Sequence, residues 1–171
     1  MKLALSCTAE YSNYFGASSS AQVALVLAGM NATMTRVNGV LENDLAVHLN
    51  IIAGTTSVIY YNPSTDPYDD ALIGTGNSAS NNYISTWNAQ LMNTLHTTLG
   101  DSAFDIGHLF GQSGGGGNAG CIGCICSNDM TVDTDGSPQN YKGSGFTSPY
   151  DGIPQGDNYD IDYVVHEMGH Q

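Results

Sequence analysis

The chain has 171 residues, with 16 Asp and Glu against 3 Lys and Arg, which give a formal net charge of −13 and a pI near 4.1. This length suits a single domain with a sizeable core, and so acidic a surface repels phosphate backbones, so we expect no nucleic-acid partner. No run of 18 apolar residues occurs, so we also expect no membrane span.

The first third of the chain predicts strands on either side of one long helix. Apolar residues alternate at the start and predict a strand over 2–10 with one buried face, followed by a connection over 11–16. Apolar residues at helical spacing predict a helix over 21–45. A second strand is expected over 46–53, and 57–61 either extends it or forms a short extra strand.

The middle of the chain continues the alternation of helix and strand. Residues 62–82 are rich in Pro, Asp, Gly, Ser and Asn and predict a loop. A helical period predicts a helix over 83–99 that ends at Gly100, and a strand is expected over 103–110. Residues 127–158 are mostly loop, with a further strand near 142–147. This order predicts an α/β sheet with parallel neighbours and crossovers on its faces.

Four glycines at 114–117 precede a segment with three closely spaced cysteines. Glycine lets another backbone approach closely, which suits the rim of a binding cleft. A flexible hairpin turn has the same composition, so glycine content alone leaves both interpretations open.

The composition also suggests where the protein works. Few possible ion pairs and 21 glycines among many Ser, Thr and Asn are typical of exported proteins. The apolar stretch within 1–7 is too short for a signal peptide. We therefore expect a secreted protein whose signal and pro-segment are absent from this chain, or one cut from a longer gene.

The last thirteen residues contain His-Glu-x-x-His in a segment expected to be helical and capped by Asn158 or Asp160. On a helix, His166 and His170 lie on one face, so both imidazoles can bind one zinc ion. Glu167 lies about 100° round the helix, beside the metal, where it can act on a bound water. The alternative is a surface helix with two unrelated histidines.

Three segments together resemble the metzincin clan of zinc endopeptidases, specifically its bacterial reprolysin-like (adamalysin-type) branch. They are Thr35–His48, Phe104–His108 and Asp160–His170, in the family's order. The resemblance implies a zincin-like α/β fold with a mixed, mostly parallel, five-stranded twisted sheet. It also implies an antiparallel edge strand, long helices packed on the sheet and a C-terminal active-site helix.

The resemblance places the edge strand at about 119–127, lining the substrate cleft. An extended protein or peptide substrate would add its backbone to this strand. The residues implied to contact substrate are Ala119, Gly120, Cys121, Ile122 and Gly123.

The resemblance covers only the first part of the family's zinc-binding motif. The family continues to a third histidine ligand and a methionine-containing turn, whereas the sequence ends at Gln171. A catalytic zinc takes three protein ligands and one water. We therefore expect residues 1–171 to form a single domain, the upper subdomain of a catalytic domain, with weak zinc binding and little activity.

The implied function is a zinc-dependent endopeptidase with His166 and His170 as metal ligands and Glu167 as general base. A second hypothesis is a non-catalytic exported binding or adhesive module in which the motif is accidental or vestigial. A third keeps the zinc and takes a distant Glu as the third ligand, as in thermolysin-like proteins.

Four cysteines suggest two disulfides in an exported protein, and three pairings are open. Cys121 with Cys124 could close a small loop while Cys126 reaches Cys7. A zinc site on the three clustered cysteines is the alternative, although it lacks an obvious fourth ligand.

Two further groups could bind metal. The acidic residues near 128–136 resemble a calcium loop, but their spacing does not fit an EF-hand, and a solvated acidic turn is the alternative. For His48, His96 and His108 we expect structural roles, and His108 is the one to check for proximity to the cleft.

Overall fold

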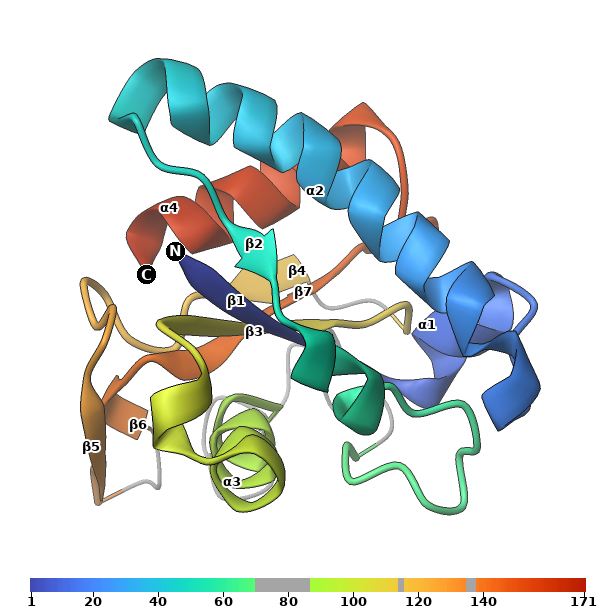
Figure 1. The fold of residues 1–171 in the computed structure, drawn as a ribbon, viewed down its shortest axis with the longest axis horizontal. Coiled ribbons are helices and arrows are strands. Elements are labelled where there is room, and N and C mark those ends of the chain that lie inside the picture. The colour runs from blue at the N-terminus through green and yellow to red at the C-terminus, as the bar shows by residue number, and fades with distance from the viewer. Residues whose placement is uncertain (70–86, 114–115, 135–137) are drawn as a thin grey trace.

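The computed structural model describes residues 1–69, 87–113, 116–134 and 138–171. A five-stranded sheet forms its centre, with helices on both faces (Figure 1). The strands of this sheet are β1 (Lys2–Cys7), β2 (Asn50–Ile51), β3 (Ile106–Phe110), β4 (Gly116–Asn118) and β7 (Gly143–Ser148). The α-helices are α1 (Ala9–Tyr14), α2 (Val23–Leu45), α3 (Trp87–Leu99) and α4 (His166–His170), and a π-helix, η6 (Asn158–Val165), leads into α4.

The strand order is β2-β1-β3-β7-β4, and the first four strands run parallel. β4 pairs antiparallel with β7 and forms one edge. The mixed, mostly parallel sheet with an antiparallel edge strand is therefore confirmed. No helix in the described ranges is both long and apolar enough to cross a membrane.

Two apolar layers enclose the sheet. α2 and the C-terminal helices pack on one face through residues such as Leu3, Leu5 and Met30, whereas α3 covers the other face with Trp87 and Leu95 (Figure 1). The prediction of one buried face for the first strand is wrong, because Ala4 lies in the same apolar cluster as α3 and the Ser6 hydroxyl donates to the Val58 carbonyl.

Several predicted boundaries differ from the structure near β1. The expected connection over 11–16 lies largely in α1, whose first turn is capped by Thr8 accepting from the Tyr11 N–H. Of the strand expected over 46–53, only β2 forms: the range begins with Ala46, the left-handed residue that ends α2, and a 3₁₀ turn starts at Ala53. This 3₁₀ turn (Ala53–Val58) takes the place of the expected extension, and of the extra strand considered over 57–61 only a single parallel bridge forms, between Ile59 and Cys7. Within the turn, Thr55 Oγ1 accepts from the Leu5 N–H at 3.2 Å, a bond that a neighbouring strand would otherwise take.

The later elements follow the predictions more closely. The expected strand at 142–147 is β7, the last parallel strand. The expected helix at 83–99 is α3 from residue 87 onward, and its first four residues lie outside the described ranges, as does most of the loop at 62–82. A separate two-stranded sheet, β5 (Asn128–Val132) with β6 (Pro138–Tyr141), was not predicted.

Candidate metal centre and cleft

α4 brings His166 and His170 onto one exposed face. Their Nε2 atoms lie 3.1 Å apart and their ring centroids 4.6 Å apart. Two nitrogens at 2.0–2.1 Å from one tetrahedral zinc would be roughly 3.3 Å apart. The two imidazoles therefore fit a shared zinc ion with little rearrangement.

The π-helix before α4 is tied to α2 by a buried carboxylate. Asp160 accepts from Thr33 Oγ1 at 2.8 Å and lies 2.8 Å from Arg36 Nε. Arg36 also pairs with the exposed Asp157. Asp160 was expected to cap the helix, but its side chain bonds to α2 instead. The resulting tether holds the start of the metal-binding segment.

Glu167 faces away from the solvent and lies against the edge strand. A Cβ atom on Gly117 of β4 would lie 2.5 Å from Glu167 Oε1, so the carboxylate occupies space that only glycine leaves free. Burial raises the pKa of Glu167, and the two histidines and a backbone hydrogen bond from Ala119 partly oppose that rise. The acid therefore lies between the imidazole pair and the edge of the sheet.

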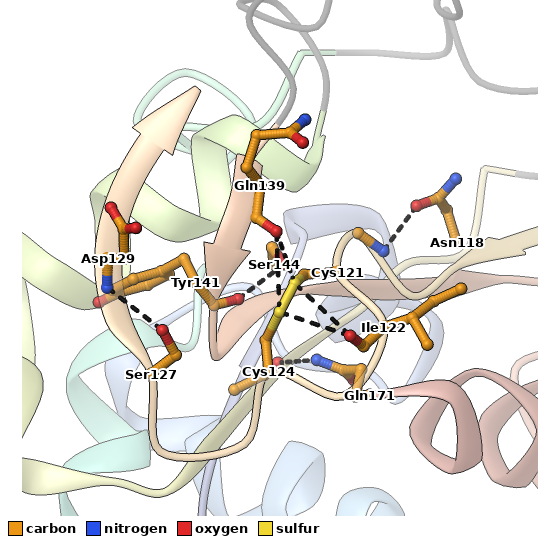
Figure 2. The surroundings of a disulfide bond; sticks show 12 residues. Asn118, Cys121, Ile122, Cys124, Ser127, Asp129, Gln139, Tyr141, Ser144 and Gln171 are labelled. Carbon is orange, nitrogen blue, oxygen red and sulfur yellow. Dashed lines mark hydrogen bonds between the residues drawn. A yellow bond between two sulfur atoms is a disulfide. The ribbon is translucent and has the colours of Figure 1, made fainter. Parts of the chain in front are cut away.

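The edge strand lies earlier in the chain than expected. β4 ends at Asn118, and the residues expected to form a strand over 119–127 turn instead. Gly120 and Gly123 have φ values of +72° and +70°, a left-handed backbone that suits turns and interrupts a strand. The Gly120 N–H donates to Asn118 Oδ1 at 2.7 Å. Figure 2 shows this loop around Cys121 and Cys124.

The five residues expected to contact substrate have separate positions in this loop. The Ala119 N–H donates a hydrogen bond to the Glu167 carboxylate. Gly120 packs on Ser144, and Cys121 belongs to a disulfide. Ile122 is 80% exposed and extends outward in Figure 2. The Gly123 N–H donates to the His170 carbonyl at 3.0 Å. The loop thus contacts both ends of the His-Glu-x-x-His segment.

The sequence profile of metallo-peptidase family M12B, reprolysin-like, matches residues 1–171. The chain belongs to this family. No curated protein matches the chain. Family membership confirms the resemblance drawn from three sequence segments, and it makes the protein a metallopeptidase at family level, of a kind that is zinc-dependent in general.

In this reprolysin-like chain, Cys121 and Cys124 form a disulfide, one of the pairings that the sequence left open. The second expected pair, Cys7 with Cys126, does not form. Cys7 is buried on β1, where burial raises its thiol pKa to about 12, whereas Cys126 is exposed. The fold therefore encloses the Cys7 thiol, whereas the Cys126 thiol faces solvent.

The remaining histidines have partners other than a metal. His48 bonds to Glu42, and His96 lies 3.1 Å from Asp101. His108 is fully buried and bonds to Gln171, the residue after His170. The structural role expected for His108 is thus met by a buried hydrogen bond, but Gln171 was not predicted, because nothing local distinguishes a buried glutamine from an exposed one.

No group of three His, Cys, Asp or Glu suited to a metal occurs within the described ranges. The three clustered cysteines therefore form no zinc site there. The calcium alternative near 128–136 is unsupported: Asp129 and Asp133 accept from nearby backbone amides, and 135–136 lie outside the described residues.

Proposed function

We propose that this protein is a zinc-dependent endopeptidase whose zinc is held by His166 and His170, with Glu167 as the general base. The observation that supports this most directly is the 3.1 Å separation of the two Nε2 atoms. A buried carboxylate beside them supplies the acid–base group that metal-assisted peptide hydrolysis needs. An accidental motif on a surface helix would not require its acid to lie against a sheet edge.

Zinc, when bound, would lower the pKa of a coordinated water to about 7 and polarise the scissile carbonyl. Glu167 would accept the proton of the attacking water and later pass it to the leaving amine. Burial favours the first of these transfers, because it raises the pKa of Glu167 and so strengthens the carboxylate as a base. The Ala119 N–H would keep the carboxylate oriented between transfers.

The proposed substrate is an extended peptide that pairs with β4. Within the sheet, β4 has β7 as its neighbour on one side and lies at the end of the strand order. Its other side can accept an added strand through backbone hydrogen bonds. Because Gly117 of β4 touches Glu167, a peptide added there would lie beside the proposed base.

A catalytic zinc takes three protein ligands, and the described residues offer two at this site. We propose that residues 1–171 form the upper subdomain of a metzincin-type catalytic domain and that the third donor lies outside the described residues. The disulfide supports a secreted location, because such bonds persist in oxidising compartments.

Zinc titration by calorimetry tests the metal ligands. His166→Ala and His170→Ala should each weaken zinc binding at least about tenfold, since each removes one donor. Zinc affinity that is equal in wild type and both variants would contradict the proposal and favour a non-catalytic binding module.

Glu167→Gln separates catalysis from metal binding. The amide cannot accept the proton of water, so peptide hydrolysis by a protein that also carries the third zinc ligand should fall by roughly 10²-fold or more. Zinc affinity should change little, because Glu167 is not a ligand. Hydrolysis that continues at the wild-type rate would exclude Glu167 as the base.

A further inference from the structure

We infer that Gln171 and His108 form a positioning pair that holds the metal-binding end of α4 against the sheet and thereby sets the place of the His170 imidazole. The inference rests on the proposed zinc site. It adds two residues that touch neither metal nor substrate and act through the backbone next to His170.

The Gln171 side chain is bonded at both ends. Its Nε2 donates to the Gly107 carbonyl at 3.0 Å, and its Oε1 lies 2.6 Å from His108 Nδ1. A carbonyl only accepts, so the amide nitrogen faces Gly107 and the amide oxygen accepts from His108 Nδ1–H. His108 Nε2 then accepts from Thr147 Oγ1 at 2.9 Å. Every polar atom of the buried pair therefore has a partner.

The sheet is shaped to receive this side chain. The β3–β7 register shifts after Gly107↔Gly143, so His108 pairs with Gly145 and Ser144 is the extra residue. A Cβ atom on Gly145 would overlap the amide of Gln171. The bulge and the missing side chain together form a socket on two strands that the Gln171 amide fills.

The last turn of α4 is held by both the loop and the sheet. α4 continues the π-helix η6 directly, since Val165 and His166 both have helical backbone angles. Two contacts fix its last turn: the Gly123 N–H bonds to the His170 carbonyl at 3.0 Å, and the next side chain enters the socket. The His170 ring lies between these two anchors, so its position depends on both.

Loss of the anchor should weaken metal binding. Residues that orient a metal ligand without touching the metal typically change affinity 10- to 100-fold when removed. We expect Gln171→Ala to weaken zinc binding about tenfold, measured by calorimetry at pH 7.5. Gly39→Ala is a suitable control, because a Cβ atom there meets open space on α2 and should leave the affinity unchanged.

Variants of His108 distinguish positioning from bulk packing. His108→Leu keeps an apolar body but removes the donor to Gln171, so zinc affinity should fall as in Gln171→Ala. His108→Asn retains an amide donor near the Nδ1 position and should restore most of the affinity. Equal affinities for the Leu and Asn variants would overturn the role assigned to the hydrogen bond.

A double-mutant cycle tests the socket. Gly145→Ala should weaken zinc binding when Gln171 is present, because the new methyl group overlaps the amide. In the Gln171→Ala background the same change should cost little, giving a coupling that independent sites would not show. If the losses of zinc affinity from the two substitutions simply add, Gly145 and Gln171 act independently and the socket plays no part.

Thermal unfolding of the metal-free protein, measured for each variant, distinguishes a positioning role from a purely structural one. A purely structural role would lower thermal stability and leave zinc affinity as in wild type, which would overturn the inference. Failure of the proposed function looks different: zinc affinity would then not respond to His166→Ala. If affinity responds to His166→Ala but not to Gln171→Ala, only the positioning role is wrong.

Discussion

His108 is a neutral imidazole enclosed by the fold. Burial lowers its pKa from 6.5 to about 4, and the bond to Gln171 only partly offsets this. The folded protein therefore binds fewer protons at this site than the unfolded chain between about pH 6.5 and 4. Because the folded-state pKa is the lower one, stability is fully present above pH 6.5 and falls as the pH drops through this window.

We expect the His108 imidazole to lower the free energy of unfolding by about 2 kcal/mol between pH 7.5 and 5. Urea unfolding of wild type and His108→Asn at both pH values measures it, because the asparagine does not titrate. The difference between the two proteins should shrink or reverse at pH 5. A difference that stays constant across this range would show that His108 does not titrate on unfolding.

At the scale of elements, the loop between β4 and β5 links the disulfide to the proposed centre. It donates from Gly123 to the end of α4, and Cys121 and Cys124 enclose that glycine. A sequence separation of 3 makes the closed ring small, so the entropic gain is about 2 kcal/mol by the chain-entropy relation. The larger effect should be local, on the backbone of the loop.

Replacing both cysteines, Cys121→Ser with Cys124→Ser, should lower the free energy of unfolding by about 2 kcal/mol or less. Amide hydrogen exchange at Gly123 should become faster, because the ring no longer restricts that residue. A reducing agent should produce the same change in wild type and none in the variant. Unchanged exchange at Gly123 in both experiments would show that the disulfide does not restrain the residue that bonds to the end of α4.

Across the whole molecule, negative charge greatly exceeds positive charge. The chain's 3 basic residues are all engaged: Lys2 lies 3.8 Å from Asp105, Arg36 pairs with Asp160, and Lys142 donates to the Asp101 carbonyl. With a formal net charge of −13, most carboxylates have no basic side chain to oppose them. Mutual repulsion of these charges destabilises the compact state.

Salt should therefore stabilise this protein. The Debye length falls from about 30 Å at 0.01 M to about 10 Å at 0.1 M, which screens repulsion across the surface. Raising NaCl from 10 to 200 mM should raise the free energy of unfolding by on the order of 1 kcal/mol. Thermal unfolding measures this, with sucrose at equal osmolality as the control. A fall in stability with salt would show that the few ion pairs outweigh the repulsion.

The sequence by itself determined what depends on neighbours along the chain. The helical period of α2, the alternation of strands and helices, and the i, i+4 spacing of His166 and His170 are local properties, and local geometry alone places those two imidazoles together. The order of the three resembling segments was enough to predict the mixed sheet and the family.

Only the tertiary structure decided what depends on distant contacts. β4 ends before residue 119, Cys121 pairs with Cys124 while Cys7 is buried, and the first strand is covered on both faces because the 3₁₀ turn Ala53–Val58 packs against it. Gln171 enters a socket made by residues 107 and 145, far from it in sequence. A residue's burial and its hydrogen-bond partners follow from which segments meet in space, and no periodicity in the chain records that.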